Sequence, residues 1–396
     1  MADHYLEEAH LLLRARARVF AADRLAAEPP PHETAGEVEA RAVALVRALG
    51  EAGLLGEVVP AEFAPPHARA EGRAGAAGAG VSSRALCVVR EELGAADGLA
   101  DFAFAMQGLG SYPVTLAGTA AQRAALLPPV ARGESVAAFA LTEPEAGSDV
   151  AAISTRADPD GAGWVLHGRK HLISNAGVAD LYCTFAVTHP GAGKRGISAF
   201  VVRAGDAGFA VEARQEAMSP HPLGVVRFDG CRVGADRLLG APGDGLKIAL
   251  GTLEVFRPTV GAAAIGMGRR ALEEAIGHVK RRRQFGAPLA ALQGVQFLLA
   301  DSAVDLEAAR LLVLRAARAR DLARPGERHV LWSAAAKLHA TEAAWRTIDR
   351  AVQLHGGTGV LRGTPVERLY REVRALRIYE GASEVQRAVI ARELLR

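Results

Sequence analysis

The order in which hydrophobic patterns follow one another constrains the fold of this chain most strongly. Beyond Pro242, apolar residues recur at helical spacing through three long stretches, 246–280, 292–322 and 328–354, and then through a shorter one, 384–395. Helices of this length are typical of an antiparallel four-helix bundle. The last part of the chain is therefore predicted to be such a bundle.

The stretch before the predicted bundle has a different pattern. Short extended segments are separated there by glycine, proline and aspartate, which is typical of strands joined by turns. These segments are 137–141, 164–167, 181–187, 198–202, 209–213 and 225–228. This part of the chain is therefore predicted to be a β domain.

Helical spacing returns in the first part of the chain. Helices are predicted at 6–25, 38–53 and 83–93, with loops at 29–31 and 64–80. An order of helices, then strands, then long helices argues against a doubly wound βαβ fold.

The expected fold class is α+β with helix predominating. It comprises an N-terminal helical domain (1–136), a middle β-sandwich or barrel domain (137–240) and a C-terminal four-helix bundle (241–396).

Composition and charge exclude several classes of function. The chain has 396 residues, 50% hydrophobic and 23% charged, which is ordinary for a folded protein of two or three units. Its 47 basic residues are interleaved with 44 acidic ones, so no nucleic-acid partner is expected. The three cysteines are widely spaced and include no Cys-x-x-Cys pair, so neither a disulfide framework nor a zinc site is expected. No metal site is predicted.

The sequence also bears on location. No apolar run approaches the roughly 20 residues of a membrane helix, and no basic segment leads into an apolar one at the start of the chain. We therefore expect no membrane span and a cytoplasmic location.

One carboxylate stands out near the C-terminus. Glu380 lies between Tyr379 and Gly381, just before a helix whose start is marked by Ser383 and Gln386 at the spacing of a capping box. Glu380 is therefore predicted to lie on a loop. In a dry cleft, desolvation would raise the pKa of such a carboxylate toward that of a useful base. An exposed loop glutamate is the alternative and the usual case for this residue type.

Two further segments carry polar residues at the ends of strands. The first, 139–149, ends in a loop where backbone amides and the hydroxyls of Thr142 and Ser148 could hold an electron-rich ring or a phosphate. The alternative, which composition alone favours, is a turn that carries polar side chains but binds no ligand. The second segment, 168–177, is taken as a hairpin strand, with His167 and His171 flanking the turn.

Glycines close the last long helix. At the end of that helix, Gly356 and Gly357 mark either a C-cap or a place where a ligand approaches the backbone closely. The common signatures of hydrolases, P-loop proteins and zinc proteases are missing. Gly357-Thr358-Gly359 is followed by Arg362 where a dinucleotide-binding fingerprint needs its third glycine.

Taken together, these segments resemble the acyl-CoA dehydrogenase family over essentially the whole chain. The most specific parts are 141–149, the 282–286 turn, 351–359 and 370–396. The resemblance implies an FAD-dependent homotetramer, built as a dimer of dimers, that oxidises an acyl-CoA and passes electrons to an electron-transfer flavoprotein.

The resemblance also implies the residues of the site. The cofactor-binding positions would be Leu141, Thr142, Gly147, Ser148, Ile173, Ser174, Arg282, Phe285, Gln353, Gly356, Gly357, Ala382 and Glu384. Substrate contacts would be Ser148, Glu254, Arg257, Tyr379 and Gly381. Arg282 matches an arginine that reaches the FAD pyrophosphate of a neighbouring subunit, a task suited to a guanidinium.

Glu380 matches the catalytic base of the family. The implied reaction removes a proton from the carbon α to a thioester while a hydride leaves the β carbon for the flavin, so that a trans-2-enoyl thioester forms. The Glu380 backbone amide would hydrogen-bond the thioester carbonyl. Some family members place the base just before the arginine that corresponds to Arg257, but that position is Phe256 here, which cannot accept a proton.

Departures from the family pattern leave other functions open. Leu172 replaces a frequent tryptophan, Ala382 replaces a hydroxyl residue, and 219–224 replaces a segment that usually carries arginine and serine. An acyl-CoA oxidase or a flavin monooxygenase on the same fold, or a non-catalytic helical scaffold, are the alternatives. Acyl chain length and the choice between CoA and a carrier-protein thioester are not encoded in any of these motifs.

Overall fold

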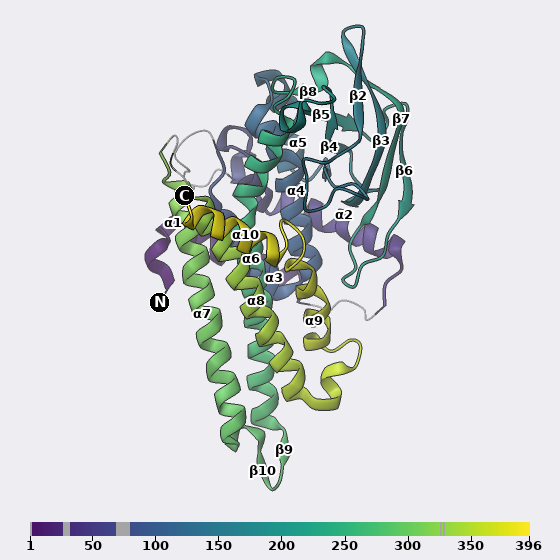
Figure 1. Ribbon diagram of the computed structural model, residues 1–396. Helices are drawn as coiled ribbons and strands as arrows, with labels where there is room; N and C mark the ends of the chain where they lie inside the picture. Colours follow the sequence, from purple (N-terminus) through teal and green to yellow (C-terminus); the bar gives the residue numbers. More distant parts are fainter. Residues whose placement is uncertain (1, 27–31, 69–79, 325–326, 328) are drawn as a thin grey trace.

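The computed structural model describes residues 2–26, 32–68, 80–324, 327 and 329–396, in which a helical zone, a sheet and a second helical zone follow one another (Figure 1). This order confirms the predicted fold class. The predicted loop at 29–31 and most of the one at 64–80 lie outside the described residues. The domain boundaries at 136 and 240 stay predictions.

The first zone is built from helices around a buried central one. Its α-helices are α1 (Glu8–Arg24), α2 (Ala35–Glu51), α3 (Ser83–Ala96), α4 (Gly98–Ala117) and α5 (Ala120–Ala131), with short 3-10 turns at Ala2–Tyr5, Leu54–Val58, Ala61–Phe63 and Pro66–Ala68. Nearly every residue of α4 is buried, because the helix packs against α2, α3, α5 and the sheet. Such all-round burial marks α4 as the centre of this zone.

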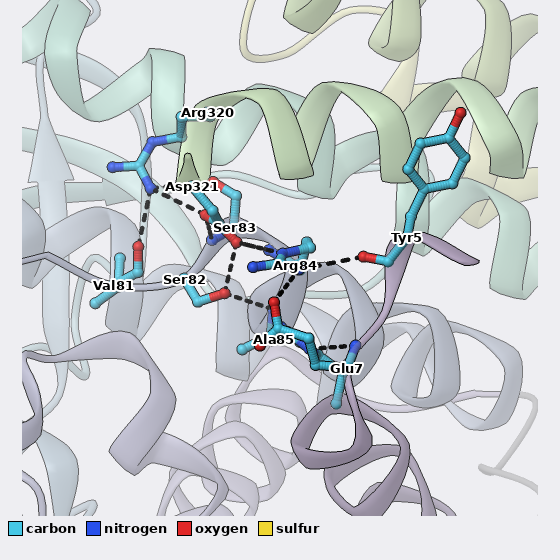
Figure 2. Close-up of polar contacts among 10 residues, drawn as sticks. Tyr5, Glu7, Val81, Ser82, Ser83, Arg84, Ala85, Arg320 and Asp321 are labelled. Carbon is cyan, nitrogen blue, oxygen red and sulfur yellow. Dashed lines mark hydrogen bonds and ion pairs between the residues drawn. The ribbon is translucent and has the colours of Figure 1, made fainter. Parts of the chain in front are cut away.

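A buried carboxylate joins the start of α3 to the end of the long helix α7 (Gln293–Asp321), as Figure 2 shows. Asp321, 1% exposed, accepts hydrogen bonds from the Ser82 hydroxyl (2.7 Å), the Ser83 amide (2.6 Å) and the Arg84 Nε (3.0 Å). Arg84 also donates to Glu7 at 2.8 Å. A negative charge at a helix N-terminus satisfies amides that have no partner within the helix. The contact therefore fixes α3 against the C-terminal zone.

The middle zone is a connected sheet. Its strands are β1 (Ala137–Ala140), β2 (Arg156–Asp160), β3 (Gly163–Ser174), β4 (Leu181–Val187), β5 (Ile197–Arg203), β6 (Phe209–Arg214), β7 (Leu223–Val233) and β8 (Leu238–Leu239). Within the described residues they pair in the order β6-β7-β3-β2-β4-β5-β8, and β1 adds to β4 in parallel. The zone thus forms one eight-stranded sheet.

Two details of the sheet differ from the sequence expectation. His167 and His171 both lie within the continuous strand β3, so the predicted turn between them is wrong. The turn instead joins β2 to β3 at Gly161, whose φ of 59° suits glycine. Strand β2 was not predicted, because its sequence Arg-Ala-Asp-Pro-Asp is polar and contains proline.

The last zone is a bundle of long helices. It contains α6 (Gly245–Arg281), α7, α8 (Val330–His355), α9 (Pro365–Leu376) and α10 (Ser383–Leu394). The long helices α6, α7 and α8 lie side by side (Figure 1). The β9–β10 hairpin (Arg283–Gln284 and Ala287–Pro288) lies at one end of the bundle, and the yellow α10 crosses the bundle toward the opposite end. Helix α9 was not predicted, although Val366, Leu369, Val373 and Leu376 follow helical spacing and are all buried.

Glycines allow α3 and α6 to pack closely. A Cβ on Gly266 would clash with the Glu91 carbonyl, and one on Gly94 would come within 2.7 Å of the Ala263 carbonyl oxygen. The backbones of the two helices therefore touch directly. Within the described residues, α6 is also long and apolar enough to cross a membrane, but 72% of its apolar window is buried inside the protein. Such burial fits a core helix.

Candidate active site

A cavity of about 200 Å³ lies where the three zones meet. Its apolar wall comes largely from one face of α4, with Phe102, Ala105, Met106 and Leu109. The cavity is also bordered by the following positions predicted from the sequence: Leu141, Thr142, Gly147, Ser174, Tyr379, Glu380 and Gly381. Residues from the β1–β2 loop, the end of β3 and the α9–α10 loop are thus brought together, although they are far apart in the sequence.

The α9–α10 loop presents Glu380 to this cavity. Glu380 has a φ of 52°, a left-handed conformation that costs a non-glycine residue about 1–2 kcal/mol, and Gly381 follows with a φ of 94°. The side-chain amide of Gln386 donates to the carbonyls of Gly381 (2.9 Å) and Glu380 (3.3 Å). The positive φ of Gly381 favours glycine there, and a Cβ would also meet this amide. The prediction that Glu380 lies on a loop is confirmed.

The predicted capping box at the start of α10 is wrong. Ser383 is the first residue of the helix, and Ala382 occupies the N-cap position without a side-chain cap. The Ser383 hydroxyl donates to Glu342 on α8 at 2.6 Å, while Gln386 holds the loop carbonyls instead. Both side chains therefore form hydrogen bonds outside the helix instead of the two reciprocal bonds of a capping box.

The electrostatic surroundings of Glu380 are those of a buried carboxylate among cations. Burial raises its pKa above the ordinary value, and the positive charges of Arg90, Lys337 and Arg257 oppose that rise. Within the described residues, the Glu380 Oε2 is buried and has no hydrogen-bond partner. A carboxylate oxygen without a partner in a cavity remains free to take a proton from a ligand.

Arg90 is a wall residue that sequence reasoning missed. It lies on α3, is 1% exposed and forms a two-point ion pair with Asp101, with both N···O distances at 2.8 Å. A third donor reaches the Thr259 hydroxyl at 2.9 Å. Burial raises the pKa of Tyr379, so its phenol stays neutral beside this pair. Charged residues at apolar positions of two buried helices were the only sequence signal for Arg90 and Asp101.

A second buried ion pair supports the β1–β2 loop. The Lys170 ammonium, 0% exposed, donates to the Glu143 carboxylate (2.7 Å) and to the Leu141 carbonyl (3.0 Å). Glu143 also accepts from the amides of Ser154 (2.6 Å) and Thr155 (3.0 Å). Burial alone would raise the pKa of Glu143, but Lys170 and these hydrogen bonds lower it to about 2. The pair thus fixes the loop that carries the cavity residues.

The remaining positions predicted around the cavity differ in exposure. Ser148 lies exposed on the β1–β2 loop, whereas Ile173 is buried in the sheet. Leu172, with a φ of 55° and half exposed, interrupts the pairing of β3 with β7 and lines the cavity. Ala382 is half-buried beside the Glu380 loop, and Glu384 is exposed on α10.

A separate group of predicted positions lies at the hairpin end of the bundle. It consists of Arg282, Phe285, Gln353, Gly356 and Gly357, all of them exposed. Phe285 is 92% exposed at the tip of the β9–β10 hairpin, and Gly356 ends α8 with a φ of 61°, as the cap interpretation predicted. A single copy of the chain does not bring these residues to the Glu380 cavity, as Figure 1 shows for the hairpin and the α9–α10 loop.

Of the two predicted substrate contacts on α6, Arg257 interacts electrostatically with Glu380, whereas Glu254 does not line the Glu380 cavity. Burial lowers the pKa of Arg257, whereas the charges of Glu380 and Glu254 raise it. Within the described part of the chain, the Arg257 Nε is buried without a hydrogen-bond partner. Glu254 pairs with His329 at 3.3 Å and lines a neighbouring hollow instead of the Glu380 cavity. Among the described residues, no cluster of three or more His, Cys, Asp or Glu side chains is suited to hold a metal ion.

Family comparisons match the chain in three consecutive parts. The models of the N-terminal, middle and C-terminal domains of acyl-CoA dehydrogenases match residues 7–134, 138–231 and 243–395. The chain belongs to the acyl-CoA dehydrogenase family. A probable acyl-CoA dehydrogenase of Mycobacterium leprae, fadE25, is 39% identical to it, with 99% of this chain and 96% of that protein covered.

Solved structures of this family have the same fold. Butyryl-CoA dehydrogenase from Megasphaera elsdenii superposes with a TM-score of 0.87 at 31% identity, covering 99% of both chains. A chain from work on the electron transferring flavoprotein of Acidaminococcus fermentans gives a TM-score of 0.86 at 34% identity, again covering 99% of both chains. The protein is therefore an oxidoreductase of the acyl-CoA dehydrogenase type, and its family is flavin-dependent.

The residues of this acyl-CoA dehydrogenase fit a flavin and a thioester at the cavity. The cavity combines an apolar wall with an unpartnered carboxylate oxygen. Gly147 borders it with no other atom within 4 Å of the place a Cβ would occupy, so a ligand can approach the backbone there.

Proposed function

We propose that this acyl-CoA dehydrogenase binds FAD and converts an acyl-CoA thioester into the trans-2-enoyl-CoA, with Glu380 as the base that removes the α proton. The observation that carries this proposal is the buried, unpartnered Oε2 of Glu380 at the wall of an apolar cavity. A bound FAD would supply the hydride acceptor for the β carbon. The α C–H bond breaks toward Glu380, which is left protonated, and the electron pair forms the new double bond.

Protein groups account for the proton transfer. Burial raises the pKa of Glu380 toward that of an effective base, while Arg90, Lys337 and Arg257 keep the carboxylate form accessible. The Glu380 backbone amide would donate to the thioester carbonyl, which stabilises the charge that develops when the α proton leaves. The apolar wall from α4 would hold the acyl chain and exclude water from Glu380.

We assign the FAD site to two groups of residues in different subunits. Leu141, Thr142, Gly147 and Ser174 border the cavity, and Ser148, Ile173, Ala382 and Glu384 complete this part of the site. Arg282, Phe285, Gln353, Gly356 and Gly357 would reach the cofactor of a neighbouring subunit. Their exposure at the hairpin end of the bundle supports a homotetramer built as a dimer of dimers.

Substrate, electron acceptor and location complete the proposal. An acyl-CoA is the proposed substrate, with Ser148, Glu254, Arg257, Tyr379 and Gly381 as its contacts. An electron-transfer flavoprotein is the proposed acceptor, supported by the related chain from Acidaminococcus fermentans, and the proposed location is the cytoplasm.

Anaerobic bleaching of the flavin tests this function. The purified protein is expected to be yellow, and one or more members of an acyl-CoA panel should bleach it without oxygen. Artificial acceptors should then restore turnover while oxygen reacts slowly. Rapid turnover with oxygen alone would identify an oxidase. A colourless protein that does not take up FAD would identify a non-catalytic scaffold.

A further inference from the structure

A buried lysine lies against the loop of Glu380. Lys337, on α8, is 0% exposed, and its Nζ donates to the Gly381 carbonyl oxygen at 2.8 Å. Within the described residues, this carbonyl is its one hydrogen-bond acceptor. Nothing in the local sequence of α8 marks this position, because the lysine lies among alanines that face the bundle core.

One carbonyl does not compensate a buried ammonium. An ammonium group has three donors and loses its hydration on burial, so it persists only beside opposite charge. Burial lowers the pKa of Lys337 to about 8, and the Glu380 carboxylate is the strongest of the charges that oppose this shift. In return, Lys337 is one of three cations that lower the pKa of Glu380. The two side chains are therefore electrostatically coupled.

The carbonyl that Lys337 holds belongs to a strained turn. Glu380 has a φ of 52°, and Gly381, with a φ of 94°, accepts hydrogen bonds on its carbonyl from both Lys337 and the Gln386 amide. A left-handed glutamate persists only where its surroundings enforce that conformation. The direction of the Glu380 side chain follows from its backbone conformation, so the donors to Gly381 also aim the carboxylate.

We propose that Lys337 is a positioning residue for Glu380. The buried Lys337 ammonium holds the Gly381 carbonyl and so fixes the left-handed turn that presents the Glu380 carboxylate to the cavity. The inference rests on the proposed role of Glu380 as the base. Lys337 acts through the loop and through its charge, without touching the reacting atoms.

Four charged groups affect the pKa of Lys337. They are Glu380 from the loop, Arg257 from α6, Glu342 on α8 itself and Glu384 on α10. Arg257 and Arg90 remain in any Lys337 variant. The positive charge that lowers the pKa of Glu380 is therefore reduced but not removed.

Two substitutions separate the hydrogen bond from the charge. Lys337→Met removes both, and Lys337→Gln removes the charge but keeps a neutral N–H donor, one bond shorter, on the side of the Gly381 carbonyl. Lys247→Met, at an exposed lysine on α6, is the matched control. Flavin content and thermal unfolding are measured for each variant, together with the pH dependence of kcat/KM per bound flavin.

The protonation of Glu380 can be followed without turnover. An infrared titration of the carboxyl band that disappears in Glu380→Gln reports its midpoint directly. In Lys337→Met we expect kcat per flavin to fall by about tenfold or more and the carboxyl midpoint to move to higher pH, because a nearby cation is lost. Lys337→Gln should regain part of kcat but keep the raised midpoint. Lys247→Met should match the parent enzyme.

The outcomes distinguish the inference from the function on which it rests. Unchanged kcat per flavin and an unchanged carboxyl midpoint in both Lys337 variants would overturn the inference, even if stability or flavin content falls. If no acyl-CoA bleaches the parent enzyme but the midpoint still moves in Lys337→Gln, the proposed function fails while the coupling of Lys337 to Glu380 stands.

Discussion

The Arg90 guanidinium, which lines the cavity of Glu380, forms a two-point ion pair with the Asp101 carboxylate, with both N···O distances at 2.8 Å. Both side chains are almost completely buried, at 1% and 2% exposure. Arg90 is also the strongest of the charges that lower the pKa of Glu380. A single pair thus joins α3 to α4 and sets the charge environment of the proposed base.

Removing one member of this pair should affect stability and pH dependence together. Arg90→Met leaves Asp101 buried without its partner, and we expect the free energy of unfolding to fall by about 3–5 kcal/mol. The pKa of Glu380 should rise because a cation is lost, so the acid limb of the kcat/KM profile should move to higher pH. Chemical unfolding and pH–rate profiles check both effects.

The double variant Arg90→Met, Asp101→Leu is the control for this pair. It removes both charges and should recover much of the lost stability. The acid limb should stay above the parent position but move less than in Arg90→Met, because the charge of Asp101, which raises the pKa of Glu380, is removed as well. An acid limb at the parent position in both variants would contradict the assigned electrostatic role of Arg90.

The proposed base is tested by Glu380→Gln. The amide preserves the shape of the side chain but cannot accept the α proton, so turnover should fall by about a thousandfold or more. Flavin content and acyl-CoA binding should stay near the parent values. Stopped-flow bleaching of the flavin measures the lost step. Activity close to that of the parent enzyme would mean that another group removes the proton.

Asp321, at the end of α7, caps the start of α3 and should affect stability but not catalysis. Asp321→Asn weakens its charge-assisted hydrogen bonds with Ser82, Ser83 and Arg84, and we expect a loss of about 2–4 kcal/mol in the free energy of unfolding. Asp158→Asn, in an exposed pair with Arg156, should change it by less than about 1 kcal/mol. Urea unfolding of the two variants compares them, and equal losses would refute the capping role of Asp321.

The Glu143–Lys170 pair should make the protein sensitive to acid. The pKa of Glu143 is lowered to about 2 in the folded state, so the unfolded chain takes up the proton first as the pH falls. The stability that this carboxylate contributes is present above about pH 4.5 and is lost as the pH falls through that value toward 2. The loss should be about 3 kcal/mol.

A variant that lacks both charges checks this acid sensitivity. In Glu143→Gln, Lys170→Met, the free energy of unfolding should vary less between pH 4.5 and 2 than in the parent protein, as measured by unfolding in urea at each pH. An identical pH dependence in the two proteins would show that other carboxylates cause the acid sensitivity.

Local patterns in the sequence were enough to predict the overall architecture. The long apolar periods predicted α6, α7 and α8, and the strand β4 was predicted at its observed bounds, Leu181–Val187. Glu380 was predicted on a loop, where the structure has it. Where the local signal was weak, the prediction failed, as for the polar strand β2. Helix α9 was missed although its buried residues follow helical spacing, because it is short and strongly charged.

Only the tertiary structure decided which distant side chains meet. The Ser383 hydroxyl donates a hydrogen bond to Glu342, 41 positions away, instead of capping α10. Lys337 donates to the carbonyl of Gly381, 44 positions away. Periodicity and caps depend on near neighbours, so the sequence by itself determined the helices, the strands and their order. The partners of Arg90, Lys170 and Lys337 depend on how those elements pack, because a buried charge is stable only where the fold supplies opposite charge and hydrogen-bond acceptors.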